Sequence, residues 1–406
     1  MRKLNRREFI HFSSIHAALL TGAWHIQWLG KALAQPLSGQ WVYLNGLYSD
    51  PNSFKILRRQ GPVAPVDETH AAYLSFFTES GFEGKINVPF LPHSVLKHPD
   101  PKKPFSVIAI PRRAQIAGEI DLAERRVTQL FYPAPGGSFY GHGEIIPYKN
   151  QNFFAVSEVG DDSALGVITI RSLKDFTIVH TLKSHGHSPH QILLTANKGR
   201  ILICNSGSKL ATAQGEYVGN RFPSSLCLVD INSGTLIRKW DCPTNNEKGF
   251  FDGFAHGFTL PSGEAVLATK PQEEESNDSG NIYLLNKKRE LTKLSLPEPL
   301  QKRTKGQFLS VAYHEPSHQV FISMPLGHFT VIFSSQNWKY LTHIDFNKSN
   351  GISFSADGKQ VYISNGLGQL IKAPVSAPQR FQVINESGKG GSEAHLDRVW
   401  MPPLKS

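Results

Sequence analysis

A unit of similar pattern recurs six times along the chain. Each copy contains a turn, a short strand, a polar turn, a second strand and then small residues. Six copies begin at residues 92–96, 141–146, 189–194, 255–260, 309–313 and 350–354. Most are spaced about 40–50 residues apart, and one longer interval contains a polar loop at 206–223. Such a period is typical of β-propeller blades.

The second strand of each copy is rich in Val, Ile, Phe and Thr, and helical periodicity is nearly absent after residue 35. The expected second strands lie at 105–110, 153–157, 201–205, 265–269, 320–324 and 361–365. Strands near Trp41 and Ala71, together with a C-terminal strand near Val399, supply one further blade. We therefore expect an all-β, seven-bladed β-propeller whose ring is closed by N- and C-terminal strands. A two-sheet sandwich would not explain the repeat.

The first 34 residues have the pattern of a twin-arginine signal peptide. Arg6 and Arg7 stand in a basic stretch and are followed by a moderately apolar run. Ala32 and Ala34 are the small residues that a signal peptidase reads, so we expect cleavage before Gln35. The alternative is an amphipathic N-terminal helix that stays attached. We thus expect a signal peptide at 1–34, a single propeller domain at 35–406, export in the folded state, and localisation in the periplasm.

Charge and hydropathy narrow the function classes. The formal net charge is +10, and the signal peptide holds five Lys/Arg and one acidic residue, so cleavage leaves +6. The remaining positive charge is spread along the chain without a dense basic block, so we expect no nucleic-acid binding. No segment after the signal peptide reaches the length of an apolar membrane span.

The three cysteines, Cys204, Cys227 and Cys242, allow at most one internal disulfide. Cys227 and Cys242 flank a predicted hairpin but are offset from its turn, so we expect buried thiols. No Cys-x-x-Cys-His motif occurs, which excludes c-type haem. Neither a Gly-x-Ser-x-Gly elbow nor a phosphate-binding Gly-rich loop occurs.

Histidine recurs at one position of the repeat. His93, His142, His190 and His256 occupy it in four successive copies, and His187 stands in the loop before the third. Because the innermost strands of a propeller surround one axis, these five side chains are our candidate metal ligands at a central funnel. Imidazole suits iron, copper, zinc and nickel. A single such histidine would more often be structural, bonding to a neighbouring blade.

Other residues are weaker candidates for lining the funnel. Glu144 could bind iron or orient a histidine, and Arg112 could hold an anionic ligand. The remaining candidates are His185, Asn205 and Asn365. Phe139, Tyr140 and Phe222 could stack on an organic ligand, and we favour their interpretation as packing aromatics.

Three elements carry a resemblance to a known family. They are Ser138-Phe139-Tyr140-Gly141-His142-Gly143, the stretch from Gly186 to Pro189-His190, and the twin-arginine start. Together they resemble the exported proteins catalogued as domain of unknown function 1513. The resemblance implies a seven-bladed propeller similar to the quinoprotein amine dehydrogenase β-chain. It also implies an association with periplasmic iron acquisition, with imelysin-type iron-uptake proteins as partners, and it supplies no reaction.

The sequence departs from the family pattern at two acidic elements. Pro189-His190 is followed by Gln191 where the family has Glu, and the acidic element after the second repeat is Ser157-Glu158-Val159-Gly160. These departures argue against a carboxylate-rich iron site more than against a histidine-rich one.

Three hypotheses remain open. The favoured one is a non-enzymatic periplasmic binding protein that holds iron or copper in the funnel or docks a metal-carrying partner. The second is a metal-dependent enzyme, either a copper or iron redox enzyme or a lactonase-like hydrolase, using the same funnel. The third is a protein-interaction scaffold with structural histidines.

Overall fold

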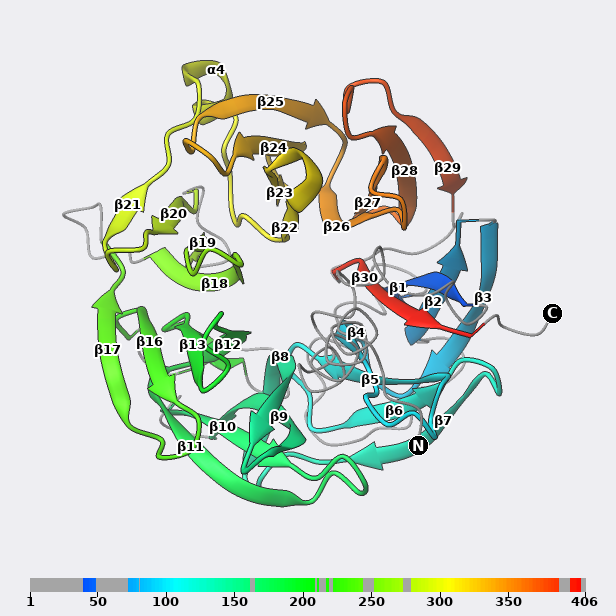
Figure 1. The fold of residues 1–406 in the computed structure, drawn as a ribbon, viewed down its shortest axis with the longest axis vertical. Coiled ribbons are helices and arrows are strands. Elements are labelled where there is room, and N and C mark those ends of the chain that lie inside the picture. The colour runs from blue at the N-terminus through cyan, green and yellow to red at the C-terminus, as the bar shows by residue number, and fades with distance from the viewer. Residues whose placement is uncertain are drawn as a thin grey trace, which may run out of the picture.

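A ring of seven antiparallel sheets makes up the molecule (Figure 1). The computed structural model describes residues 39–48, 72–79, 81–160, 165–208, 210–211, 217–218, 222–243, 252–272, 279–386 and 395–402. Within these residues there are seven four-stranded sheets, which confirms the seven-bladed propeller. The expected signal peptide at 1–34 lies outside the described residues.

The first four blades run from blue to green in Figure 1. Blade 1 holds β1 (Gln40–Tyr48), β2 (Ala72–Thr78), β3 (Gly81–Val88) and β30 (Asp397–Met401). Blade 2 holds β4 (Pro92–Lys97), β5 (Ser106–Pro111), β6 (Ala117–Asp121) and β7 (Arg126–Phe131). Blade 3 holds β8 (Gly137–Tyr148), β9 (Gln151–Gly160), β10 (Leu165–Arg171) and β11 (Ile178–His187). Blade 4 holds β12 (Pro189–Leu194), β13 (Arg200–Asn205), β16 (Ser225–Asp230) and β17 (Leu236–Asp241), with the small hairpin β14 (Leu210–Ala211) and β15 (Tyr217–Val218) inserted.

Blades 5 to 7 complete the ring. Blade 5 holds β18 (Asp252–Thr259), β19 (Ala265–Pro271), β20 (Ile282–Leu285) and β21 (Leu291–Lys293). Blade 6 follows the short helix α4 (Glu298–Gln301) and holds β22 (Val311–His314), β23 (Gln319–Met324), β24 (Phe329–Ser334) and β25 (Tyr340–Asp345), with the 3-10 turn η1 (Glu315–Ser317). Blade 7 holds β26 (Ser349–Phe354), β27 (Gln360–Asn365), β28 (Gln369–Pro374) and β29 (Gln382–Glu386). In the described part of the chain, no helix is long and apolar enough to cross a membrane.

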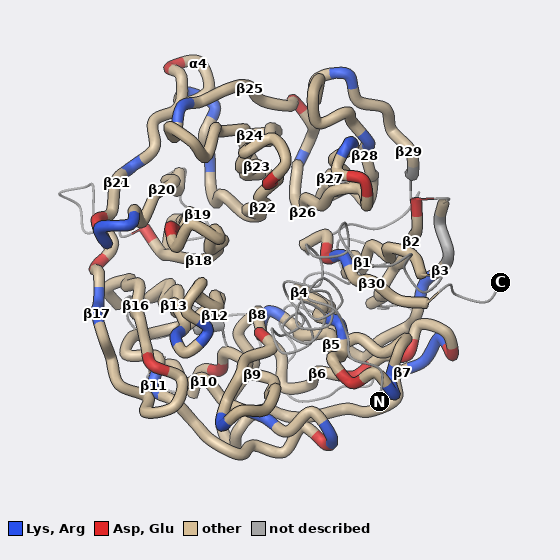
Figure 2. Tube along the Cα trace, viewed as in Figure 1, with Lys and Arg blue, Asp and Glu red and all other residues tan. Residues whose placement is uncertain are grey.

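Burial changes from the middle of each blade to its rim. Every residue of β5 is buried, because neighbouring blades cover both faces of that strand. The outer strand β7 instead alternates between exposed and partly buried positions until its last residue. Lys and Arg are interspersed with Asp and Glu around the outside of the ring (Figure 2). This gradient leaves the inner strands as the elements that can bring side chains from many blades together.

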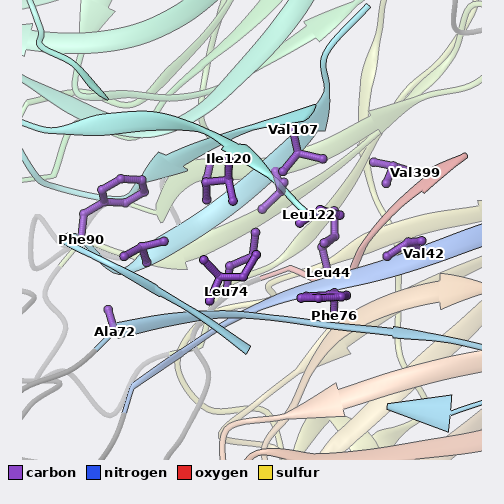
Figure 3. Close-up of a cluster of buried hydrophobic side chains, with 14 of the residues drawn as sticks. Val42, Leu44, Ala72, Leu74, Phe76, Phe90, Val107, Ile120, Leu122 and Val399 are labelled. Carbon is purple, nitrogen blue, oxygen red and sulfur yellow. The ribbon is translucent and has the colours of Figure 1, made fainter. Parts of the chain in front are cut away.

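The ring closes where the two ends of the chain share blade 1, as expected. The C-terminal strand β30 pairs with β1 in antiparallel register, with Val42 opposite Val399. Both valines belong to the apolar cluster between blades 1 and 2 shown in Figure 3, where Val107 of β5 is also buried. On the other side, the hydroxyl of Tyr43 donates to the carbonyl of Phe354 in blade 7 at 3.1 Å. Burial of these groups holds the last strand in place.

Polar side chains connect neighbouring inner strands around the axis. The hydroxyl of Ser94 in β4 donates to the carbonyl of Gly141 in β8 at 3.0 Å. The side-chain oxygen of Gln191 in β12 accepts from the backbone N–H of Gly257 in β18 at 2.8 Å. Since a buried polar group needs a partner, these bonds fix how one inner strand stands against the next.

Candidate metal centre

Five histidine side chains meet at the propeller axis. His93, His142, His190 and His256 come from the inner strands β4, β8, β12 and β18, and His395 lies just before the inner strand β30. We call these five residues the axial cluster. Their neighbouring ring centres are 4.6 to 5.9 Å apart. The structure thus brings together four of the five histidines that the sequence marked as metal ligands, and adds one that it did not.

Four members of the cluster are close enough to share an ion. One ligand nitrogen from each of His93, His142, His256 and His395 lies within 4.8 Å of all the others. Imidazole nitrogens bind a zinc-sized ion at about 2.0–2.1 Å, so ligands on opposite sides of an ion are about 4 Å apart. The observed spacing therefore requires side-chain shifts of less than about 1 Å to surround one ion.

A distorted segment of β8 explains the Phe139-Tyr140-Gly141-His142-Gly143 element. The pairing of β8 with β9 is shifted between Phe139 and Gly143, which adds backbone at the axis. The carbonyl of Tyr140 accepts a hydrogen bond from Nδ1 of His190 at 2.8 Å. Gly141 has φ +125°, and a Cβ there would lie 2.6 Å from Cε1 of His190. Only glycine tolerates both that conformation and that contact.

His395 is held by groups from two other blades. Its Nδ1 pairs with the hydroxyl of Ser310 at 2.7 Å, and its backbone N–H donates to the carbonyl of His93 at 3.1 Å. The repeat could not reveal this residue, because the closing blade takes its inner strand from the C-terminus and breaks the spacing. The available signal was a histidine four residues before Val399, in the segment expected to close the ring.

Several imidazole nitrogens in the cluster are buried without partners. Among the described residues, nothing hydrogen-bonds Nε2 of His142, Nδ1 of His256 or Nε2 of His395. A buried polar atom left without a partner costs about 1–3 kcal/mol of stability. Because most buried polar groups in proteins are paired, three unpaired nitrogens at one point indicate a ligand site.

Burial keeps these imidazoles neutral. It lowers the pKa of His142, His190 and His256 well below the usual 6.5, because a second charge among these histidines, or one beside a nearby Arg or Lys, would be repelled as well as desolvated. Burial, and then Arg112, lowers the pKa of His395 to about 4. Neutral imidazole is the form that coordinates metals, so the cluster is ready to bind an ion at neutral pH.

The charged groups that act on the cluster are cationic. Arg112 follows Pro111, the residue of β5 that pairs with Pro92, and its charge lowers the pKa of His142, His256 and His395. The buried Lys270 of β19 acts in the same direction on His190. The Arg112 charge therefore acts on the cluster, and its role in holding an anionic ligand stays a prediction.

The other histidine and acidic candidates lie outside the cluster. His187 stacks on Phe222 with ring centres 3.8 Å apart, and Nε2 of His185 contacts the carbonyl of Gly234 at 3.2 Å. Glu144 accepts from its neighbouring backbone N–H at Ile145, and burial raises its pKa to about 8. Its side chain shares a strand with His142 without joining the group of ligand nitrogens.

The two asparagine candidates have structural contacts. Asn205 donates to the carbonyl of Ser184 at 3.1 Å, and Asn365 accepts from the N–H of Leu367 and of Gln369 in the β27–β28 turn. Glu158, the remaining acid of the departing family element, forms a buried ion pair with Arg171 at 2.6 Å.

The cysteines are free and buried, as expected. Burial raises the pKa of the Cys204 thiol to about 12 and also raises the pKa values of Cys227 and Cys242. None of these thiols belongs to the group of possible ligands that the structure describes.

Solved structures share the fold. The chain resembles a hypothetical selenium-binding protein from Sulfolobus tokodaii at 12% identity and TM-score 0.58, covering 89% of this chain and 96% of that one. It also resembles Kuenenia stuttgartiensis hydrazine synthase at 12% identity and TM-score 0.54, covering 78% and 92%. The Swd1 β-propeller domain of Myceliophteria thermophila matches at 10% identity and TM-score 0.50, covering 73% and 89%. At such identities the likeness concerns the fold alone.

Family membership rests on the sequence. No curated protein matches the chain. The family model described as "Protein of unknown function (DUF1513)" matches residues 86–399, a range that contains all five histidines of the axial cluster. The likeness to the amine dehydrogenase β-chain and the twin-arginine signal stay predictions. The chain belongs to the DUF1513 family of proteins of unknown function.

Proposed function

We propose that this propeller is a periplasmic metal-binding protein that holds one first-row transition-metal ion in the axial cluster. The observation that carries the proposal is the convergence of four imidazole nitrogens within 4.8 Å of one another. They come from blades 1, 2, 3 and 5, so no single stretch of sequence accounts for their meeting. The three unpaired buried nitrogens support a ligand role over a structural one.

The donor set narrows the choice of metal. It consists of neutral imidazoles, and no thiolate or carboxylate is part of it among the described residues. Imidazole suits iron, copper, zinc and nickel, whereas magnesium and calcium prefer oxygen ligands. Between the suitable metals, the family resemblance favours iron, and we propose that the protein is an accessory of iron acquisition that meets imelysin-type proteins in the periplasm.

Elemental analysis tests the binding proposal. The protein is exported by its own signal, purified from the periplasm without chelator or affinity His-tag, and compared with the His142→Ala/His256→Ala double variant. We expect close to one equivalent of iron or copper in the native protein and background metal in the double variant, with unchanged far-UV circular dichroism.

A matched control separates the cluster from histidines in general. His318 and His328 are exposed and have φ values of +52° and +60°, which asparagine tolerates. The His318→Asn/His328→Asn variant should keep its metal. Background metal in the native protein, even after anaerobic incubation with Fe(II) and Cu(I), would contradict the proposal.

Export has its own test. Replacing Arg6 and Arg7 with Lys should leave the protein in the cytoplasm, because the twin-arginine pathway requires the arginine pair. Cell fractionation followed by immunoblotting measures the distribution, and equal periplasmic amounts of both forms would remove the export proposal without affecting the metal site.

A further inference from the structure

We infer that the axial cluster forms two overlapping metal positions on opposite sides of one shared triangle, and that a single ion can pass between them. The inference deepens the proposed function and rests on it. The shared triangle consists of His93, His142 and His256. His395 completes the position on one side, and His190 completes the position on the other.

The ring distances carry the inference. The triangle has sides of 4.9, 5.3 and 5.9 Å between ring centres. The His395 ring centre lies 5.0, 4.8 and 4.8 Å from those of His93, His142 and His256. The His190 ring centre lies 5.3, 5.1 and 4.6 Å from the same three. His190 and His395 are thus almost equally near to the triangle.

Those equal distances put His190 and His395 on opposite sides. A point at fixed distances from three others can occupy only two places, one on each face of the triangle that they define. Because two rings cannot fill the same place, His190 and His395 lie on different faces. Each face therefore has its own four-imidazole set, and the two sets have three members in common.

The outer nitrogens of both capping histidines are anchored. Nδ1 of His190 pairs with the carbonyl of Tyr140, and Nδ1 of His395 pairs with the hydroxyl of Ser310. A carbonyl can only accept, so Nδ1 of His190 carries the proton and Nε2 keeps its lone pair. Such contacts orient metal-binding histidines and fix their tautomer.

The two metal positions are not equally well formed. The group of ligand nitrogens within 4.8 Å includes His395 and not His190, so the position capped by His395 is the more nearly formed. The His190 ring packs against Gly141, and a residue with a side chain at position 141 would collide with that ring. An ion moving through the triangle would exchange His395 for His190 while keeping three ligands.

Electrostatics limits the occupancy to one. Two positions that share three ligands lie too close together for two like-charged ions in a buried site. Arg112 and Lys270 add positive charge on the same cluster. The arrangement therefore suits a transition-metal ion that is received on one side and released on the other, which is what a cargo-binding protein needs.

Titration with Co(II) alone tests the two positions. The metal-free, full-length native protein is compared with His190→Ala, His395→Ala, the double variant carrying both, and His142→Ala from the shared triangle. Bound Co(II) is counted by elemental analysis, and its visible absorption spectrum reports the ligand set. His190→Gln serves as a second variant, because its amide can still donate to the Tyr140 carbonyl.

We expect each single capping variant to keep one equivalent of Co(II), with an affinity loss of no more than about tenfold. The spectrum should change in a different way in each. The double variant should lose affinity by more than the product of the single effects, because each cap substitutes for the other. His142→Ala should weaken binding more than either single capping variant.

The outcomes separate the two proposals. If His395→Ala abolishes binding while His190→Ala and His190→Gln leave spectrum and affinity unchanged, there is one position and this inference is overturned while the proposed function stands. If the native protein binds no Co(II), Fe(II) or Cu(I), both the proposed function and this inference are overturned.

Discussion

Among the described residues, blades 1 to 5 each bring a histidine to the axis, whereas blades 6 and 7 bring none. All seven have four antiparallel strands, and the inner strands β22 and β26 stand in the ring like the others (Figure 1). At the aligned position, blade 6 has Ser310 and blade 7 has Gly351. The two groups of blades therefore share an architecture and differ in what they present to the centre.

The two blades without histidine support the closing segment instead. The hydroxyl of Ser310 pairs with Nδ1 of His395 at 2.7 Å. A Cβ on Gly351 would lie 2.2 Å from the backbone nitrogen of Leu396, so only glycine lets that segment pass. Blades 6 and 7 thus position a histidine that belongs to blade 1.

This difference bears on why the histidines are there. Blades 6 and 7 pack into the ring without an imidazole at this position, so propeller packing alone does not require one. The three unpaired nitrogens in the other blades reduce the stability of the metal-free protein. Residues kept at such a cost are typical of a site that serves function.

The largest expected effect is on the pH dependence of the metal-free protein. The cluster imidazoles have pKa values below 6.5 when folded, so below pH 6.5 the unfolded chain binds more protons than the folded one. Stability is therefore retained above pH 6.5 and falls as the pH drops below 6.5, by about 1.4 kcal/mol per pH unit for each imidazole that stays neutral in the folded protein.

Urea unfolding at several pH values measures this slope. Saturation with metal should raise the stability at each pH while leaving this slope in place, because the folded imidazoles carry no proton in either form and the slope comes from protonation of the unfolded chain. A slope that stays unchanged in the His142→Ala/His256→Ala variant would show that other groups cause it.

A second effect should appear on the blades that lack histidine. Gly351→Val forces a side chain against the backbone of Leu396, and we expect a loss of about 3 kcal/mol of stability and faster proteolysis of the C-terminal segment. Gly160→Ala is the control, since nothing lies within 4 Å of its added Cβ. Equal stability of the two variants would mean that the closing segment does not depend on this approach.

A third pair of variants compares the two groups of blades directly. His142→Leu removes a buried unpaired nitrogen and should raise the stability of the metal-free protein at pH 7.5 by about 1 kcal/mol. Ser310→Ala removes a hydrogen bond and should lower it by about 1 kcal/mol. Chemical denaturation measures both stability changes. If His142→Leu destabilises the protein, His142 has a structural role in the metal-free protein.

The smallest effect concerns charge. Arg112→Gln removes a positive charge that acts on the cluster, so divalent metal should bind about three- to tenfold more tightly. Lys359→Gln on blade 7, an exposed residue, should change nothing. Metal titration at low and moderate salt measures both, and identical affinities would show that Arg112 is screened from the ion.

The repeat in the sequence predicts much of the fold and part of the candidate site. The repeat predicted seven blades, the second strand of six of them, the shared closing blade and four of the clustered histidines. Repeats reveal backbone positions, but the direction of a side chain depends on local irregularities such as the shifted pairing after Phe139. For that reason spacing alone does not separate Glu144 from His142, two residues before it. Spacing also groups Asn205, Asn365, His185 and His187 with the site, although the contacts described for them lie elsewhere.

The position of His395 has a consequence for synthesis. A ribosome that has made every blade strand before β30 has already delivered four of the five imidazoles, and the fifth follows with His395, just before β30. Chains cut before His395 lack one cap of the cluster and one strand of the ring at the same time. Metal retention would then report on whether the ring has been closed.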